Sequence, residues 1–201
     1  MATEDRRTRR TRSALRHALV ELAVERSFGE VTVEEITERA DVGRATFYTH
    51  FRDKDALYDD VVSALVAELA VRTRPEDTAG EGFTGRPVHA LFEHAADEVE
   101  SYRMVLRGDG DGRARRALAG ALVDAAEDVF RVRVAEAGVV PRIDLTVLAY
   151  AWVGEQLEVL GWWLEGGRAV PLEQVVGMLA DLSRYGRRWA TGFAVNAPGE
   201  G

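Results

Sequence analysis

The stretch from residue 31 to residue 57, VTVEEITERADVGRATFYTHFRDKDAL, constrains the fold of this chain more than any other segment. Thr32 and Glu35 have the spacing of a capping box, in which a hydroxyl and a carboxylate bind the free amides at the start of a helix. The run Asp41-Val42-Gly43 breaks that helix, and a second, very short helix is expected over residues 44–50. Two helices joined by a short turn are the geometry that presents a recognition helix to a DNA major groove.

The same stretch resembles the DNA-binding motif of the TetR (tetracycline-repressor-like) family of transcriptional regulators. The family pattern is an Ile or Val helix ending in Ala, then V-S-x-x-T-[LF]-Y-x-[HY]-F and a Lys-x-x-Leu that opens the next helix. The positions that carry the resemblance are Ile36, Ala40, Val42, Gly43, Thr46, Phe47, Tyr48, His50, Phe51, Lys54 and Leu57. One departure is Gly43, where the family usually has Ser or Thr. Gly caps a helix nearly as well as Thr, so the same fold is expected with one possible phosphate-facing hydroxyl lost.

The second helix of the motif is expected to have two faces. Phe47 and Phe51 lie four residues apart and should face the core of the head. The candidates for the exposed face are Arg44, Ala45, Thr46, Tyr48, Thr49 and His50. The resemblance implies that Arg44 and Ala45 read base edges, whereas Thr46, Tyr48, His50 and Lys54 hold phosphates. This agrees with the chemistry, because Arg can clamp guanine and Ala can touch a thymine methyl. An ordinary amphipathic surface helix is the alternative.

Charge is distributed unevenly along the chain, which has a formal net charge of −8. Residues 1–58 carry 11 basic and 11 acidic groups, whereas residues 59–201 carry 15 basic and 23 acidic groups. A neutral head on an acidic body can still dock one face on phosphates. Residues 1–8 are expected to be disordered. The Arg-rich start, with Arg9 and Arg10, is either a solvated tail or an arm that contacts DNA. Thr32 is a further candidate for DNA contact.

The chain as a whole is expected to be all-α, because no segment alternates with period two for long enough to form a strand. Helices besides those of the motif are expected at about 10–27, 54–72, 87–106, 113–137 and 143–165, and from residue 171 onward. The predicted organisation is a three-helix helix-turn-helix DNA-binding head (1–56), a larger helical ligand-binding and dimerisation body (57–193), and a disordered tail (194–201).

The helix expected at 143–165 is apolar nearly all round, which indicates burial on every side and, in a domain of this size, a partner chain. Glycines inside this helix and the next cost about 1 kcal/mol each relative to Ala. Close approach of two copies in a four-helix bundle explains them, and ordinary crossing within the chain is the alternative. The predicted interface residues are Gly154, Leu157, Gly161, Val176, Leu179 and Trp189.

Aromatic side chains of the body, together with a few polar ones, are candidates for the lining of a small-molecule pocket. These candidates are Phe92, Tyr102, Met104, Phe130, Trp152, Glu155, Gln156 and Trp163. Plain hydrophobic core is the alternative, because aromatic residues at helical spacing are usually core. The chemical identity of the ligand is not encoded in this set.

Several classes of function find no support in the sequence. Cysteine is absent, and no nucleophile is paired with a base, so neither an enzyme nor a cofactor is expected. His89, Glu93 and Asp97 share a helix face that could bind a metal, but solvated surface is the favoured interpretation and no metal site is predicted. No apolar run reaches the roughly 18 residues of a membrane span, and the N-terminus is not signal-like, so the cytoplasm is expected.

These observations predict a ligand-responsive repressor of the TetR type that binds a palindromic operator as a homodimer and is released by a small-molecule inducer. One alternative is a constitutive regulator without a ligand pocket. The other is a small-molecule-binding or interaction protein whose head does not bind DNA.

Overall fold

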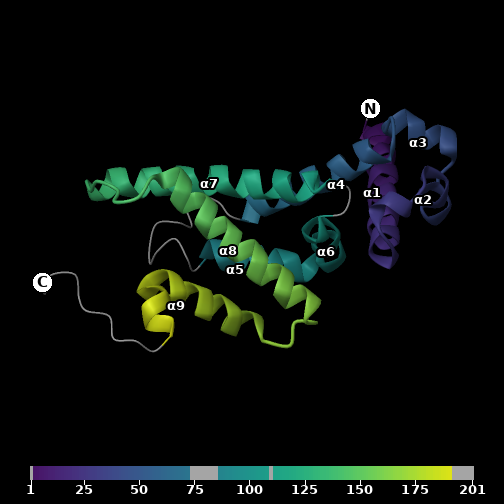
Figure 1. Ribbon diagram of the computed structural model, residues 1–201. Helices are drawn as coiled ribbons and strands as arrows, with labels where there is room; N and C mark the ends of the chain where they lie inside the picture. The colour runs from purple at the N-terminus through teal and green to yellow at the C-terminus, as the bar shows by residue number, and fades with distance from the viewer. Residues whose placement is uncertain (1, 73–85, 109–110, 192–201) are drawn as a thin grey trace, which may run out of the picture. The chain divides into compact units, whose positions relative to one another are not determined.

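The computed structural model describes residues 2–72, 86–108 and 111–191, and these residues form helices joined by short turns (Figure 1). The elements are α1 (Ala2–Glu25), the 3₁₀ turn η1 (Phe28–Glu30), α2 (Val33–Arg39), α3 (Arg44–His50), α4 (Lys54–Arg72), α5 (Arg86–Asp97), α6 (Val99–Arg107), α7 (Arg113–Ala137), α8 (Leu145–Glu165) and α9 (Leu172–Ala190). The described ranges contain no strand, so the predicted all-α class is confirmed. None of their helices is both long and apolar enough to cross a membrane.

The chain divides into two compact units. Unit 1 comprises Met1–Glu68 and Glu98–Leu122, and unit 2 comprises Leu69–Asp97 and Val123–Gly201. The helices α1, α2, α3 and α6 lie in unit 1, and α5, α8 and α9 lie in unit 2, whereas α4 and α7 begin in unit 1 and end in unit 2. The expected functional boundary between residues 56 and 57 stays a prediction, and the expected tail at 194–201 lies outside the described residues.

The core of unit 1 forms where α1 packs against α2 and α6. Leu15 and Leu19 of α1 are fully buried, as are Phe47 of α3 and Leu57 of α4. Each such side chain contributes about 1.5–3 kcal/mol through burial. This core therefore fixes the helix-turn-helix segment on α1 and on the start of α4.

The core of unit 2 forms where α5 packs against α8 and α9. Phe92 of α5 and Trp163 of α8 are buried, with ring centroids 5.5 Å apart. The indole Nε1 of Trp163 donates to the carbonyl of Val170 at 2.7 Å, so this polar atom is satisfied within the core.

The structure corrects the expected start of the first helix. Residues 2–8 are helical rather than disordered, because α1 begins at Ala2. High charge removes apolar periodicity but not helix propensity, and Ala, Glu and Arg are all favourable helix formers. The helix nucleated by the apolar stripe of residues 15–23 can therefore extend toward the N-terminus through a charged segment.

The expected helix at 87–106 is two helices, because the backbone breaks at Glu98 (φ −113°, ψ 42°). The apolar stripe of α5, which includes Val88 and Phe92, is buried in unit 2, whereas Tyr102 of α6 is buried in unit 1. Apolar residues can continue at helical spacing across a break in the backbone, so the spacing alone did not reveal the break at Glu98. The last helix also has an irregularity, at Gly186 (φ 78°).

The expectation that the helix at 143–165 is buried on every side is not met within one chain. Leu157 and Leu160 of α8 are buried, but Val147, Tyr150 and Trp162 are 58–63% exposed. These three side chains lie on a helix that starts from a regular cap, in which the Asp144 carboxylate accepts from two backbone amides. The helix is therefore well formed, and part of its apolar surface is left uncovered.

Candidate nucleic-acid interface

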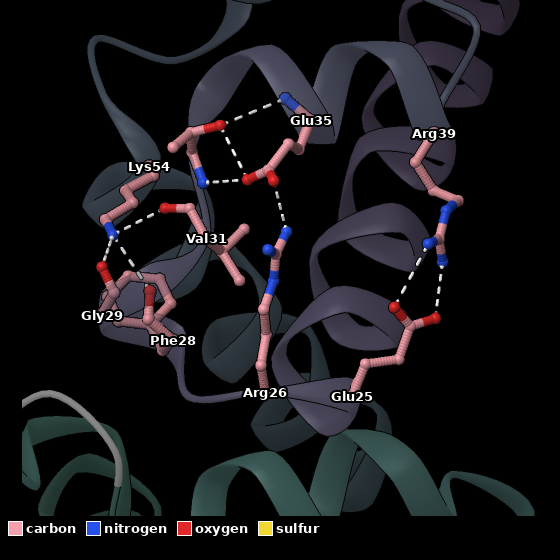
Figure 2. Close-up of polar contacts among 9 residues, drawn as sticks. Glu25, Arg26, Phe28, Gly29, Val31, Glu35, Arg39 and Lys54 are labelled. Carbon is pink, nitrogen blue, oxygen red and sulfur yellow. Dashed lines mark hydrogen bonds and ion pairs between the residues drawn. The ribbon is translucent and has the colours of Figure 1, made fainter.

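The start of α2 carries the predicted capping box, which the structure confirms (Figure 2). The amide of Glu35 donates to the Thr32 hydroxyl at 3.3 Å, and Oε2 of Glu35 accepts from the Thr32 amide at 2.9 Å and from its hydroxyl at 2.8 Å. Arg26, which follows α1, adds an ion pair of 2.6 Å to Oε1 of the same carboxylate. The Arg26 hydrogen bond, followed by those from Thr32, lowers the pKa of Glu35 to about 2. One carboxylate therefore joins the end of α1 to the start of α2.

A second polar tie holds the end of α2 against α1. The guanidinium of Arg39 donates to Glu25 at 3.1 and 3.3 Å (Figure 2). It also donates to Glu21 at 3.1 Å. The hydrogen bond from Arg39 lowers the pKa of Glu25 and the same bond raises the pKa of Arg39. Both ends of α2 are thus bound to α1 or to the residue that follows it, which fixes the orientation of α2.

The turn between α2 and α3 is tight. Asp41 has a positive φ of 51°, a conformation in which Asp and Asn are over-represented, and the Val42 amide donates to the Thr37 carbonyl at 3.0 Å. Gly43 occupies the N-cap of α3 with φ −62° and ψ 141°. A Cβ at this position would lie 3.8 Å from Oγ1 of Thr46, which is ordinary contact. Neither geometry nor space requires glycine here, so a Ser or Thr cap would fit.

The recognition helix α3 has the two faces that the sequence predicted. Phe47 and Phe51 are buried, with ring centroids 5.9 Å apart, and the Arg12 guanidinium lies 5.1 Å from the Phe51 centroid. The exposed residues of α3 are Arg44, Ala45, Thr46, Tyr48 and Thr49, and His50 is half-buried. The aromatic pair therefore anchors α3, and its outward face is polar.

Three of the predicted DNA-contact residues use their polar groups inside unit 1. The Thr32 hydroxyl donates to Glu35, and the Thr49 hydroxyl donates to the Ala45 carbonyl at 3.0 Å. The Lys54 ammonium donates to three backbone carbonyls at 2.8–3.0 Å. Their roles toward DNA stay predictions, and for Lys54 a phosphate contact would have to replace an existing hydrogen bond.

The arginines of α1 divide into two groups. Arg6, Arg7, Arg9 and Arg10 are exposed. By contrast, Arg12 and Arg16 bind the carboxylate of Asp60 in α4, with an Arg16 Nε to Oδ2 distance of 2.6 Å. The exposed group offers the larger surface for a phosphate contact, which is compatible with the predicted arm at Arg9 and Arg10.

The helix α4 is also tied to α7 within unit 1. Arg113, the first residue of α7, donates to Asp55 at 2.5 Å, and its Nε lies 3.4 Å from Asp59. The acidic residues of α4 therefore bind arginines from both α1 and α7. This arrangement could not be read from the sequence, because the partners are distant along the chain and α1, α4 and α7 each carry both acidic and basic residues.

The sequence of the head has known relatives. Residues 15–61 match the profile of the family described as bacterial regulatory proteins, tetR family. An uncharacterised HTH-type transcriptional regulator of Bacillus subtilis (strain 168), YxbF, is 36% identical over 66 residues, which cover 32% of this chain and 17% of that protein. The helix-turn-helix part of the chain therefore belongs to the TetR family. The match to YxbF concerns only a small part of that relative.

Solved TetR-family structures share the fold of the chain beyond the head. A protein of Syntrophomonas wolfei str. Goettingen assigned to this family has a TM-score of 0.77 and 14% identity, covering 93% of this chain and 98% of its own. The transcriptional regulator FadR of Bacillus subtilis, in complex with stearoyl-CoA, has a TM-score of 0.69 and 14% identity, covering 87% and 98% of the two chains. At these identities the similarity shows the TetR-family fold alone.

The predicted pocket residues of the chain fall into both units. Tyr102 and Met104 are fully buried in unit 1. The others lie in unit 2, where Phe92, Gln156 and Trp163 are buried and Phe130, Trp152 and Glu155 are half-buried. Nε2 of Gln156 donates to Glu155 at 3.4 Å, but its Oε1 has no hydrogen-bond partner among the described residues. A buried amide oxygen in this state is one that a ligand could satisfy.

The predicted interface residues are likewise divided. Leu157, Val176 and Leu179 are buried inside unit 2, so they have little surface for a partner. Gly154 is exposed and Gly161 is half-exposed, whereas the side chain of Trp189 lies outside the described part of the chain. The most exposed large apolar side chains of α8 are instead Val147, Tyr150 and Trp162, none of which was a predicted interface residue. Spacing alone does not tell which face of an all-apolar helix is covered.

The residues considered for a metal site are engaged elsewhere. Nε2 of His89 lies 2.9 Å from Glu173, and Asp97 accepts from Arg72 at 2.9 Å. Across residues 2–72, 86–108 and 111–191, no group of three His, Cys, Asp or Glu side chains could hold a metal ion.

Proposed function

We propose that the chain is a transcriptional regulator that binds a palindromic DNA operator as a homodimer, with one α3 from each copy in successive major grooves about 34–36 Å apart. The observation that carries this proposal is the division of α3 into a buried aromatic face and an exposed polar face. A short helix anchored by Phe47 and Phe51 can enter a groove without losing contact with its own core.

Specific contacts follow from the exposed face. Arg44 can clamp guanine through N7 and O6, and Ala45 beside it can touch a thymine methyl. Thr46, Tyr48 and His50 supply donors for phosphates on either side of the groove. Arg9 and Arg10, exposed on α1, supply positive charge for a further backbone contact. The match of residues 15–61 to the family profile supports this assignment.

Dimerisation through α8 and α9 is supported by the apolar surface of unit 2. Tyr150 and Trp162 of α8 are 63% and 58% exposed, and Met178 of α9 is 52% exposed. Large exposed apolar residues gathered on one part of a protein mark an interaction site. A Cβ built at Gly154 or Gly177 meets nothing within 4 Å in the described structure, so crossing within the chain does not explain these glycines. Close approach of a second copy does.

A small-molecule effector in unit 2 is the second part of the proposal. The unpartnered Oε1 of Gln156, the half-buried Trp152 and the contact between Phe92 and Trp163 support a site for a mainly apolar ligand with one polar anchor. The FadR structure with stearoyl-CoA supports an acyl chain as the first class to test, since it shares the fold. Such a ligand releases DNA only if it binds the DNA-incompetent state better. Repression relieved by an inducer is therefore the proposed regulation.

The test of DNA binding is a selection on random double-stranded DNA with the purified chain. We expect a palindrome whose half-sites are centred about 10 base pairs, or a multiple of this, apart. Enrichment of no sequence, together with no binding at low salt, would leave a ligand-binding or interaction protein as the remaining function.

The test of the effector uses the same protein with a panel of acyl-CoA thioesters. We expect at least one to raise the unfolding temperature and to weaken operator binding, and Gln156→Leu to reduce both effects. Operator binding without any binding of these thioesters would instead support a constitutive regulator without a ligand pocket.

A further inference from the structure

Lys54, the first residue of α4, is held inside unit 1 by hydrogen bonds from its ammonium group. We infer that Lys54 is a positioning residue, whose ammonium fixes the turn η1 and thereby the place where α2 begins, instead of serving as a phosphate contact. The inference rests on the proposed DNA-binding function, because the helix-turn-helix is what Lys54 positions.

The ammonium group of Lys54 has an acceptor for each of its N–H donors. Its Nζ lies 3.0 Å from the Phe28 carbonyl oxygen, 3.0 Å from that of Gly29 and 2.8 Å from that of Val31 (Figure 2). An ammonium group has three donors and no acceptor. Three carbonyls at hydrogen-bond distance therefore match its capacity, and no N–H remains for a fourth acceptor.

An aromatic ring covers another side of the ammonium. Nζ of Lys54 lies 4.7 Å from the centroid of the Phe28 ring, within the range of a cation–π interaction. The Phe28 ring stacks on Tyr58 of α4, with centroids 4.5 Å apart and an interplanar angle of 29°. Both rings are buried. The first two turns of α4 thus hold η1 through one charged and one aromatic contact.

The carbonyls that Lys54 binds belong to η1 and to the residue that follows it. Two backbone hydrogen bonds close this turn, from the Glu30 amide to the Ser27 carbonyl at 3.0 Å and from the Val31 amide to the Phe28 carbonyl at 3.3 Å, and neither of them uses the carbonyl of Gly29 or Val31. Carbonyls at the end of a short helix need partners from elsewhere. Lys54 supplies them, and Val31 directly precedes Thr32, the N-cap of α2. Fixing the Val31 carbonyl therefore fixes the first residue of the helix-turn-helix.

Arginine cannot replace lysine in this arrangement. A guanidinium directs its donors in one plane as a rigid fork, whereas the three carbonyls converge on a single nitrogen. At a phosphate contact the opposite holds, since arginine binds phosphates at least as well as lysine. The variant Lys54→Arg consequently separates the two roles, and Lys54→Met removes both. Arg52→Gln is the matched control, because Arg52 is an exposed cation two residues earlier.

The experiment begins with amide hydrogen exchange on the full chain without DNA. Lys54→Met and Lys54→Arg should both increase exchange by about 10-fold at residues 28–36, as expected from the loss of hydrogen bonds to a charged group. Arg52→Gln should leave exchange at residues 28–36 unchanged. Wild-type exchange in both Lys54 variants would overturn the inference, and this arm does not depend on DNA binding.

The second arm measures affinity for the selected operator and for random DNA, at a temperature where circular dichroism shows each variant to be folded. In both Lys54 variants, the ratio of operator affinity to random-DNA affinity should fall about 10-fold, because a misplaced helix loses base contacts. The salt dependence of DNA affinity should stay as in wild type, because phosphate contacts are kept. If Lys54 is a phosphate contact, Lys54→Met weakens both DNAs equally and lowers the salt slope by about 0.9, and Lys54→Arg binds like wild type. That result would overturn the inference.

The two arms also separate this inference from the proposed function. Failure of the wild-type protein to bind any DNA would refute the proposed function, while the exchange experiment would still decide whether Lys54 holds η1. Lys54→Arg retains the positive charge and a similar length. If Lys54→Met does not fold, the exchange and DNA-affinity measurements are made on Lys54→Arg and wild type alone.

Discussion

The outward faces of α3 and α8 differ in the chemistry that they present. Phe47 of α3 and Phe51 at its C-cap are buried, and the exposed face of α3 carries Arg44, Thr46 and Thr49 together with Tyr48, which is 49% exposed. In α8, burial of Leu157 and Leu160 still leaves Tyr150 and Trp162 exposed. A polar face with an exposed arginine suits a charged, hydrogen-bonding partner, whereas an apolar face suits another apolar face. The comparison of the two helices therefore supports the proposed DNA contact for the first and the proposed contact with a second copy of the chain for the second.

The two faces are also supported in different ways. The helices before α3 are tied by charged groups, such as Arg26 with Glu35 and Arg39 with Glu25. The contacts behind α8 are mainly apolar, as between Phe92 and Trp163. Exposed ion pairs contribute little stability each, typically 0–1 kcal/mol, but they fix orientation. Unit 1 is therefore built for the placement of a helix, and unit 2 for the burial of apolar surface.

The largest expected effect comes from removal of the aromatic anchor of α3. Phe47→Ala should destabilise the chain by about 3–5 kcal/mol, because a fully buried phenyl ring is lost and a cavity remains. Urea denaturation followed by circular dichroism measures this loss. Thr46→Ala, on the exposed side of the same helix, is the control and should change stability by no more than about 0.5 kcal/mol. Equal effects of the two changes would contradict the division of α3 into two faces.

The second prediction tests the apolar face of α8. Trp162→Glu should weaken dimerisation by at least about 30-fold, or about 2 kcal/mol, because tryptophan at an interface centre is typical of an energetic hot spot. Sedimentation velocity over a range of concentrations measures the dissociation constant. Val71→Glu is the control, since Val71 is an exposed apolar residue of α4, and it should leave dimerisation unchanged. A Trp162→Glu protein that stays dimeric would place the interface elsewhere.

The third prediction tests the polar face of α3. Arg44→Ala should cost about 1–3 kcal/mol of discrimination at one base pair of the operator, with little loss of affinity for random DNA. Fluorescence anisotropy with the selected operator and with single-base variants measures both quantities. Arg10→Ala is the comparison, because a backbone contact from α1 should weaken all DNAs alike and lower the salt slope. If Arg44→Ala affects all sequences equally, Arg44 does not read a base.

Local features of the head could be predicted from sequence because their partners are close along the chain. The capping box joins Thr32 to Glu35, and the two faces of α3 follow from Phe47 and Phe51 at helical spacing. Both depend on backbone geometry that every helix shares. The family profile covers the same part of the chain.

Other features could not be predicted because each charged residue has several possible partners. Arg12 and Asp60 are 48 residues apart, and Lys54 and Phe28 are 26 residues apart. Arg12 belongs to a run of arginines that looks uniform in the sequence, yet in the structure Arg12 binds Asp60 and Arg10 is exposed. In the same way, the apolar spacing of α8 indicated that the helix packs against other apolar surfaces. It did not indicate which side chains of α8 stay exposed within one chain. Such choices are made by tertiary packing.

The smallest expected effect concerns acid, and it separates the polar support of unit 1 from the apolar packing of unit 2. The Arg26 ion pair and the capping box lower the pKa of Glu35 from 4.5 to about 2. A carboxylate whose pKa is lower in the folded state stabilises that state above its unfolded pKa, and this contribution is lost as the pH falls toward the folded pKa. The stability difference between wild type and Glu35→Gln should therefore be constant above about pH 5.5 and shrink steadily from pH 4.5 to pH 3.

Urea denaturation of both proteins at several pH values measures this difference, with Glu34→Gln as the control because Glu34 is an exposed neighbour on the same helix. Exchange of amides in α2 should follow the same pH dependence. Exchange of the Trp163 indole N–H in unit 2 should not, because Trp163 contacts the Phe92 ring and a backbone carbonyl rather than a carboxylate. If the difference between wild type and Glu35→Gln stays flat down to pH 3, the Arg26–Glu35 pair is not formed in solution, and the start of α2 depends on Lys54 and on apolar burial instead.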